Sequence, residues 1–483
     1  MNSKERQAQL WWAAVGAATL AGLALRIAAA QARDAAGVFL RINHDNNHHL
    51  YSLWLQAIGM NASPLLARLP AIVAGTLCVP LAALVVARRS AWAGIVAAIL
   101  FAISPILVNY GSEARGYALM LLAALATLWL TTEAIDGHEK PGTPWWLALT
   151  ATLGMLSHLT MAAPVAVVAL WVYLDRRAAL GPAAAMRETA RLMGPALAAT
   201  AAVVLFVFAA AAASPTGMQL GGYLPFGWVS FLTALNDLTE WTVGLGFFQT
   251  WLAPLALALA ALWIGFRPPR WLGGRARLYA ILILAVPLGT ALVRSGNSHF
   301  ARYYLLSAIG LLLLGSEWIA RGLGKAGAAR AGAATLLVVI VLAGLWRDSE
   351  LIELKRGQPD GAVALMIERS PNGARVALDP KRLEAPLTLA ALRDRYPLAI
   401  AKGCAPADYV LAAQGPWAAS PAVIDHCGIP MRVLGSSATS SLSGEAWVLY
   451  GAGSLQTAGA PVSGRPPAAS DRRISGRAGV AQG

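Results

Sequence analysis

The chain has 483 residues, of which 57% are hydrophobic and only 13% are charged, and its mean hydropathy is +0.56. Soluble domains carry about 25% charged residues, so this composition excludes an ordinary soluble protein. The net charge of +14 would suit a nucleic-acid-binding protein, but the basic residues follow the apolar runs in a pattern that indicates membrane topology instead.

Runs of roughly 17–25 apolar residues can cross a bilayer, and the chain contains about eleven such runs. They lie at 11–30, 64–87, 91–109, 116–133, 145–160, 161–174, 193–213, 251–266, 278–294, 303–320 and 332–347. We therefore expect a mainly α-helical, polytopic membrane protein with about eleven transmembrane helices.

The basic residues alternate between segments if the N-terminus is placed in the cytoplasm. The inner segments then hold Lys4, Arg6, Arg88, Arg89, Lys140, Arg176, Arg177, Arg187, Arg191, Arg267, Arg270, Arg275, Arg277, Arg321, Lys325 and Arg330. The outer loop 214–250 has no Lys or Arg. This positive-inside bias predicts a multi-pass protein of the cytoplasmic membrane that has an extracytoplasmic C-terminus and binds no nucleic acid.

Hydrophobicity falls after residue 347, which we predict to be the end of a membrane domain formed by residues 1–347. The stretches GARVAL, DYVLAA, MRVLG and EAWVLYG resemble short strands, and 381–394 looks helical. We expect a small extracytoplasmic α/β domain at 348–453, in which a disulfide between Cys404 and Cys427 can persist. The tail 454–483 has no apolar period and is predicted to be disordered.

The stretch RINHDNNHHLY at 41–51 is the first concentration of polar side chains, and it lies just outside the first span. Its histidines and Asp45 raise the possibility of a zinc site, but they lack the i, i+4 spacing of a helical zinc pair. A carboxylate acting as general base, with His48 and His49 among its hydrogen-bonding neighbours, fits better. We prefer Asp45 to Asp34, because Asp45 lies within the polar cluster.

More titratable groups are predicted on the same outer side. Glu113 and Arg115 lie in a turn between two spans, His158 ends the stretch LGMLSH, and His299 and Arg302 belong to SGNSHFARYY. A structural interpretation of Glu113 is that it caps the following helix. Ionisable groups at membrane depth are nevertheless functional candidates, and the predicted topology brings all of these groups to one face.

These stretches resemble the polyprenyl-phosphate-dependent GT-C glycosyltransferases, which include protein O-mannosyltransferases and the aminoarabinose transferases of lipid A. The stretch YGSEARGYALMLLAALATLWL is similar to the family's second outer loop, and its matching residues are Tyr110, Glu113, Ala114, Arg115, Tyr117, Ala118 and Leu119. HLYSLWLQAIGMNASPLLARLPAIVAG, LGMLSHLTMAAPVAV and FARYYLLSAIGLLLL resemble other family segments in the same order, so the resemblance covers about 1–320.

The resemblance implies an inverting transfer of a sugar from a polyprenyl-phosphate donor to a lipid, protein or polysaccharide acceptor outside the membrane. Asp45 and Glu113 are then the catalytic candidates, and Arg115 and Arg302 the candidates for binding the donor phosphate. Tyr110, His158 and His299 join His48 and His49 as further site candidates. If a divalent metal ion takes part, Asp45 and Glu113 are its candidate ligands.

One departure from the family concerns the base. Members usually carry an Asp-Glu pair early in the first outer loop and Pro-Pro before a Leu-Tyr, whereas this chain has Asn46 to His49 before Leu50 and no Asp-Glu pair. The only acidic residues of this loop are Asp34 and Asp45, so the base is assigned to Asp45, within the polar cluster.

Two other classes stay open at this point. A transporter or flippase of a lipid or glycan would also have many spans and polar outer loops, but it would place ionisable groups near mid-membrane and show an inverted repeat or broken helices. A non-catalytic accessory membrane protein would tolerate alanine substitutions in both polar outer loops.

The topology is directly testable. Reporter tags inserted after Lys140 and after Arg275 should report the cytoplasm, because basic segments remain inside. A tag after Gly453 should report the outer side, and Cys404 and Cys427 should resist alkylation until they are reduced. A cytoplasmic signal from the tag after Gly453 would contradict the predicted topology and remove the common outer face.

Overall fold

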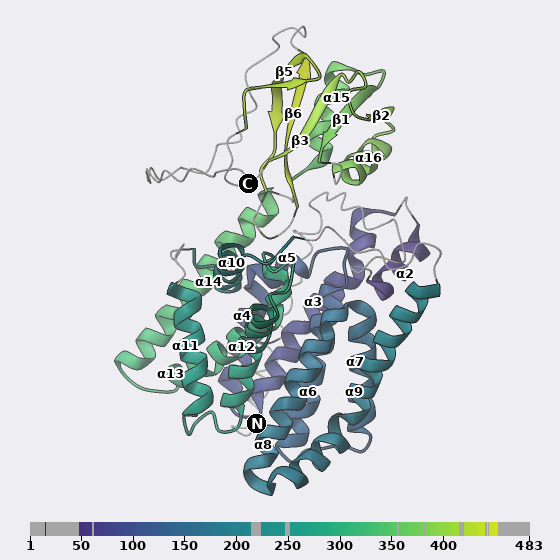
Figure 1. The fold of residues 1–483 in the computed structure, drawn as a ribbon. Coiled ribbons are helices and arrows are strands. Elements are labelled where there is room, and N and C mark those ends of the chain that lie inside the picture. Colours follow the sequence, from purple (N-terminus) through teal and green to yellow (C-terminus); the bar gives the residue numbers. More distant parts are fainter. Residues whose placement is uncertain are drawn as a thin grey trace, which may run out of the picture.

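The computed structural model describes residues 15, 48–59, 62–213, 224–246, 252–354, 357–380, 383–414, 420–439, 442 and 444–452. Helices fill most of the range up to residue 354, and a six-stranded sheet follows (Figure 1). The predicted first span at 11–30 and the predicted disordered tail at 454–483 lie outside this description, apart from Val15.

The helical part begins with a short helix, α2, and continues through long helices that run between two ends of the bundle (Figure 1). The bounds are α2 (His49–Ile58), α3 (Pro64–Ala87), α4 (Ala91–Ile103), α5 (Pro105–Tyr110), α6 (Tyr117–Ile135), α7 (Thr143–Ser157), η1 (Leu159–Met161), α8 (Ala162–Leu180), α9 (Pro182–Ala213), α10 (Trp228–Val243), α11 (Leu252–Phe266), α12 (Arg275–Val293), η2 (Ala301–Tyr304), α13 (Leu305–Leu323) and α14 (Ala328–Leu354).

Within the described residues, seven helical stretches are long and apolar enough to cross a membrane. They are Pro64–Ala87, Tyr117–Ile135, Leu159–Leu180, Pro182–Ala209, Arg275–Val293, Ala301–Leu323 and Ala328–Arg369. The predicted polytopic, mainly helical fold class is therefore confirmed, whereas the count of about eleven is not. Ala91–Ile103 and Leu252–Phe266 are apolar but shorter, and the predicted span 145–160 is the helix Thr143–Ser157.

Proline explains one interruption. The predicted span 91–109 is divided into α4 and α5 at Ser104, which adopts an extended conformation before Pro105. A residue that precedes proline is pushed out of the α region. The Ser104 hydroxyl then donates to the carbonyl oxygen of Thr242 at 2.8 Å, which ties this junction to α10.

Ion pairs connect the helices at the end of the bundle away from the sheet. Arg275 donates to Asp136 at 2.7 Å and to the carbonyl oxygen of Val85 at 2.6 Å, and it lies 3.9 Å from Glu317. Arg88 forms a further ion pair with Glu133. These contacts join α3, α6, α12 and α13, and they come from segments that the charge pattern predicted to lie inside.

The C-terminal part is a mixed sheet with the strand order β2-β1-β3-β6-β5-β4. Its elements are α15 (Pro359–Arg369), β1 (Ala374–Asp379), α16 (Glu384–Arg393), β2 (Leu398–Ala401), β3 (Tyr409–Gln414), β4 (Val423–His426), β5 (Ile429–Ser436) and β6 (Ala446–Ala452). Strand β1 pairs in parallel with β2 and β3, and β6 runs antiparallel to β3 and β5. Cys404 and Cys427 form a disulfide.

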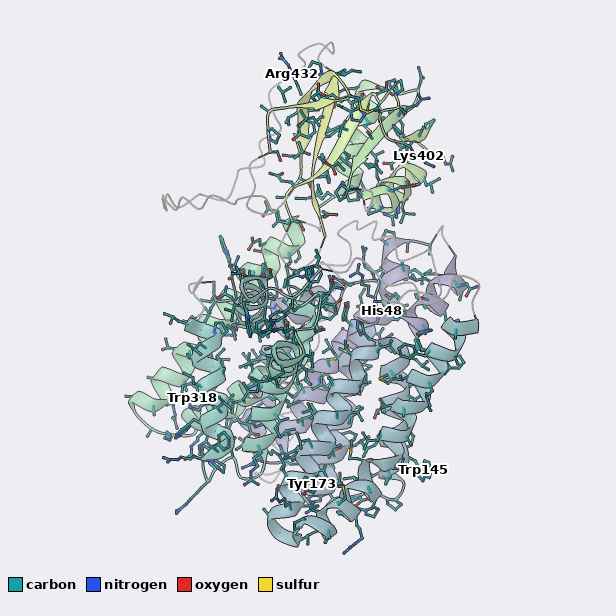
Figure 2. All side chains as sticks on the ribbon, viewed as in Figure 1. His48, Trp145, Tyr173, Trp318, Lys402 and Arg432 are labelled. Carbon is teal, nitrogen blue, oxygen red and sulfur yellow. A yellow bond between two sulfur atoms is a disulfide. The ribbon has the colours of Figure 1, made fainter. Side chains whose placement is uncertain are left out.

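The sheet lies beyond one end of the helical bundle, the end that holds α2 and α5 (Figure 1). Figure 2 places His48 at this end and Trp145 and Tyr173 toward the opposite end. We call the end that holds His48 the sheet-side end. It is the end at which α5 finishes and α6 begins.

Candidate active site at the sheet-side end of the helices

Four buried rings from four elements form a cluster at the sheet-side end. Tyr110 ends α5, Tyr117 begins α6, His158 caps the C-terminus of α7, and His48 precedes α2. Their successive ring centroids are 5.2 Å apart from Tyr110 to Tyr117, 4.6 Å from Tyr117 to His158 and 4.9 Å from His158 to His48. We call these four residues the ring cluster.

The turn 111–116 is pressed against the end of α7. A Cβ atom on Gly116 would lie 1.9 Å from the carbonyl oxygen of Ser157, so only glycine permits this approach. The same carbonyl oxygen accepts a hydrogen bond from Nδ1 of His48 at 3.1 Å. Ser157 thus joins the turn to the segment before α2.

The two histidines of the ring cluster are held in their neutral forms. Burial, and then the positive charge of Arg115, lower the pKa of His48 from 6.5 to about 4. Burial also lowers the pKa of His158 well below its usual value, with smaller contributions from His48 and Arg302. Both imidazoles are therefore uncharged at neutral pH.

Charged side chains surround the ring cluster. The Glu113 side chain, on a residue only 3% exposed, accepts from Asn109 Nδ2 at 3.4 Å and lies 3.9 Å from the guanidinium of Arg115. Arg302 stacks on Phe300, with its guanidinium carbon 3.8 Å from the ring centroid. Arg115, Glu113 and Arg302 all act electrostatically on His48.

A cavity of about 430 Å³ opens beside these groups, between α6, α8, α12 and α13. Its walls are mostly apolar, and its polar lining includes Arg302, Tyr303 and the segment 295–298. Thr160 also lines the cavity, and its hydroxyl is 2.8 Å from Nδ1 of His158. Arg302 therefore lines the cavity directly, and Thr160 connects the cavity to His158 of the ring cluster.

The structure thus brings six predicted site residues into one region: His48, Tyr110, Glu113, Arg115, His158 and Arg302. His299 is half-buried beside them and stacks on Phe300 with the centroids 3.9 Å apart. His49 is half-buried at the start of α2. Asp45, the predicted base, and Asp34 lie outside the described residues.

Three residues of this region were absent from the predicted site. Tyr117 matches the family's second outer loop in the sequence but was not among the predicted site residues, although its buried ring belongs to the ring cluster. Phe300 is an ordinary aromatic in the sequence, and its role under Arg302 depends on the fold. Gly116 had a sequence signal, since a glycine that ends a tight turn before a helix often permits a close backbone approach.

A metal site is not indicated by the residues described. Within them, no three His, Cys, Asp or Glu side chains gather in a way that could hold an ion. Glu113 supplies a carboxylate at the site, and the other candidate ligand, Asp45, is not described. A divalent cation therefore stays an expectation from the family resemblance.

Comparison with known families supports the resemblance. Residues 47–211 match the model of the family described as dolichyl-phosphate-mannose-protein mannosyltransferase. The match covers about a third of the chain, contains His48, Glu113, Arg115 and His158, and ends before Arg302. It confirms the predicted resemblance over this segment and supports the glycosyltransferase class. No curated protein sequence matches the chain.

Solved structures with a similar arrangement have low sequence identity. The oligosaccharyltransferase of Archaeoglobus fulgidus, tethered to an acceptor peptide, gives a TM-score of 0.45 at 11% identity, over 84% of this chain and 69% of that one. The AglB oligosaccharyltransferase of the same organism, in complex with an inhibitory peptide and a dolichol-phosphate, gives 0.41 at 12% identity, over 84% and 69%. ArnT from Cupriavidus metallidurans gives 0.47 at 13% identity, over 83% and 86%.

The lowered pKa of His48 predicts a pH-dependent stability. The folded protein keeps His48 neutral down to about pH 4, whereas the unfolded chain takes up the proton near 6.5. The corresponding stabilisation is present above pH 6.5 and is lost as the pH falls toward 4. In detergent, the midpoint of thermal unfolding should therefore fall between about pH 7 and about pH 5, and it should fall less in His48→Asn.

The matched control is His138→Asn, which changes an exposed histidine in the loop between α6 and α7. This variant should keep the pH dependence of the wild type. An equal pH dependence in His48→Asn and the wild type would show that His48 is not held neutral by its surroundings.

Proposed function

We propose that this protein is a membrane glycosyltransferase that moves a sugar, with inversion, from a polyprenyl-phosphate donor to a lipid, protein or polysaccharide acceptor. The observation that supports this proposal most is the cavity between α6, α8, α12 and α13, because it combines apolar walls with the Arg302 guanidinium. A polyprenyl phosphate has the same two parts, an apolar chain and an anionic head. The cavity volume also falls within the range of roughly 300–1,000 Å³ typical of ligand pockets.

The phosphate is the leaving group of the proposed reaction, so positive charge should lie where it departs. Arg302 is stacked on Phe300 and Tyr303, which limits the positions that its guanidinium can adopt. Charge-assisted hydrogen bonds from arginine to phosphate are among the stronger polar contacts in proteins. Arg302 and Arg115 are therefore the proposed donor-phosphate ligands.

The acceptor side requires a nucleophile and a proton acceptor. In the proposed step an acceptor oxygen bonds to the anomeric carbon, and the bond from that carbon to the phosphate oxygen breaks with its electron pair leaving on the phosphate. Glu113 is the proposed orienting group for the acceptor, because its carboxylate is buried between Asn109 and Arg115. Asp45 stays the candidate for taking the acceptor proton.

We place the reaction on the outer side of the cytoplasmic membrane, with the N-terminus in the cytoplasm and the C-terminal sheet outside. Support comes from the charge distribution, because Arg88, Arg89 and Arg275 gather at the end of the helices opposite to the ring cluster. In the described spans, the buried charged pairs lie near helix ends, a placement that gives the transporter alternative no specific support.

The variant Arg302→Gln tests the donor site. Loss of a charged contact to phosphate should weaken binding of undecaprenyl-phosphate mannose by about 10- to 100-fold, because glutamine can donate a hydrogen bond but carries no charge. Binding is measured by fluorescence or microscale thermophoresis in detergent, and sugar transfer is measured separately on membrane acceptors from the source cell.

Arg294→Gln is the matched control, since Arg294 is exposed near the same loop and does not line the cavity. It should bind the donor as the wild type does. Unchanged donor binding in Arg302→Gln would contradict the proposed donor site, and the absence of any sugar transfer by the wild type would contradict the proposed function.

A further inference from the structure

The two histidines of the ring cluster differ in which ring nitrogen carries the proton. His48 Nδ1 faces the carbonyl oxygen of Ser157 at 3.1 Å, and a carbonyl oxygen can only accept. His48 must therefore carry its proton on Nδ1, which leaves Nε2 as an acceptor in the neutral ring.

The opposite assignment holds for His158. Its Nδ1 accepts the backbone N–H of Thr160 at 3.1 Å, so this nitrogen is unprotonated. The neutral ring of His158 then carries its proton on Nε2, which is a donor. A contact at Nδ1 thus determines each tautomer, and the two Nε2 atoms have opposite hydrogen-bonding character: that of His48 accepts and that of His158 donates.

Both Nε2 atoms are buried, and neither has a partner in the part of the chain that the structure describes. Among the described residues, neither Nε2 of His48 nor Nε2 of His158 has a hydrogen-bond partner, and the hydroxyl of Tyr117 also has none. His48 is 3% exposed, His158 is 7% exposed and Tyr117 is 1% exposed. A buried polar group without a hydrogen-bond partner is destabilising, so three such groups in one cluster indicate a ligand.

We propose that His48 Nε2 and His158 Nε2 bind a single hydroxyl group of the sugar substrate. The hydroxyl donates a hydrogen bond to His48 Nε2, and its oxygen accepts a hydrogen bond from His158 Nε2. A sugar hydroxyl suits this pair because its single oxygen can donate one hydrogen bond and accept others. Tyr117 provides a further hydroxyl beside it. The inference rests on the proposed function, and it adds the group that the ring cluster recognises.

The two rings are neighbours: the centroids of His48 and His158 are 4.9 Å apart, and the ring of Tyr117 lies 5.4 Å from the first and 4.6 Å from the second. Thr160 contacts Nδ1 of the same His158 ring and also lines the cavity of the proposed donor site. A carboxylate or phosphate would fit less well, because His48 Nε2 offers it no proton.

The hydroxyl has two possible sources, the sugar being transferred and the acceptor. Asparagine variants distinguish the role of Nε2 from that of Nδ1. The asparagine amide can replace the hydrogen bond of Nδ1, but it does not extend to the position of Nε2. His48→Asn keeps a donor for the Ser157 carbonyl oxygen, and His158→Asn keeps an acceptor for the Thr160 N–H. His138→Asn, an exposed change at the opposite end of the bundle, is the control.

The first arm measures binding of undecaprenyl-phosphate mannose and of analogues that each lack one sugar hydroxyl. If the hydroxyl belongs to the transferred sugar, the wild type and His138→Asn should discriminate against one analogue by about 10-fold or more. His48→Asn and His158→Asn should lose this discrimination while still binding the analogue as well as the wild type does.

The second arm measures single-turnover transfer at saturating donor. If the hydroxyl belongs to the acceptor, donor discrimination should be unchanged in both variants and the transfer rate should fall by about 10-fold or more. Normal discrimination together with a normal rate in both variants would overturn the proposal, because the ring nitrogens would then hold no more than a buried water.

Nitrogen-15 NMR of histidine-labelled protein in lipid bilayers tests the tautomers without relying on activity. The signals of His48 and His158 are assigned by their loss in the two variants, and they should show Nδ1–H for His48 and Nε2–H for His158. The same tautomer in both rings would overturn the hydroxyl pair. The expected tautomers in a protein that binds no lipid-phosphate sugar would instead overturn the proposed function.

Discussion

The site depends on the carbonyl oxygen of Ser157, which is approached from two sides. Gly116 brings the turn 111–116 to a distance that a side chain would block, and His48 donates to the same oxygen. This oxygen is available because α7 ends there, with His158 in an extended conformation as its C-cap. The end of α7 therefore fixes the segment before α2 and the turn before α6 next to the ring cluster.

The electrostatics of the region follow from this packing. Arg115 and Arg302 supply positive charge near one buried carboxylate, Glu113, while the two histidines stay neutral because burial and the arginines disfavour their charged forms. The positive charge is thus carried by side chains that cannot lose their protons, and the imidazoles are left as neutral hydrogen-bonding groups. Such a division suits a substrate with an anionic phosphate and neutral hydroxyls.

The sequence predicted those features that depend on local composition. Apolar runs located the long helices, and alternation of basic segments placed Glu113, His158 and Arg302 at one end before any contact was known. The strands β1, β3, β5 and β6 coincide with the predicted apolar stretches. The predicted number of spans is not confirmed. Helices α4 and α11 are too short to cross a membrane by themselves, and Pro105 divides α4 from α5.

Other features depend on contacts between distant segments, which no single-sequence pattern records. The close approach of Gly116 to Ser157 joins two positions that are separated in the sequence by helices α6 and α7. Phe300 has no recognisable role in the sequence, but in the fold its ring stacks against Arg302. The cavity draws its lining from four helices. The role of Asp45 remains a prediction, since it lies outside the described residues.

The central claim is that the cavity holds a polyprenyl-phosphate donor with its phosphate at Arg302. A cryo-EM structure of the protein with undecaprenyl-phosphate mannose, in lipid nanodiscs, tests it most directly. The account predicts density for the prenyl chain between α6, α8, α12 and α13, with the phosphate against the guanidinium of Arg302 and the sugar toward His48 and His158. Lipid-phosphate density at another place, with this cavity empty, would contradict it.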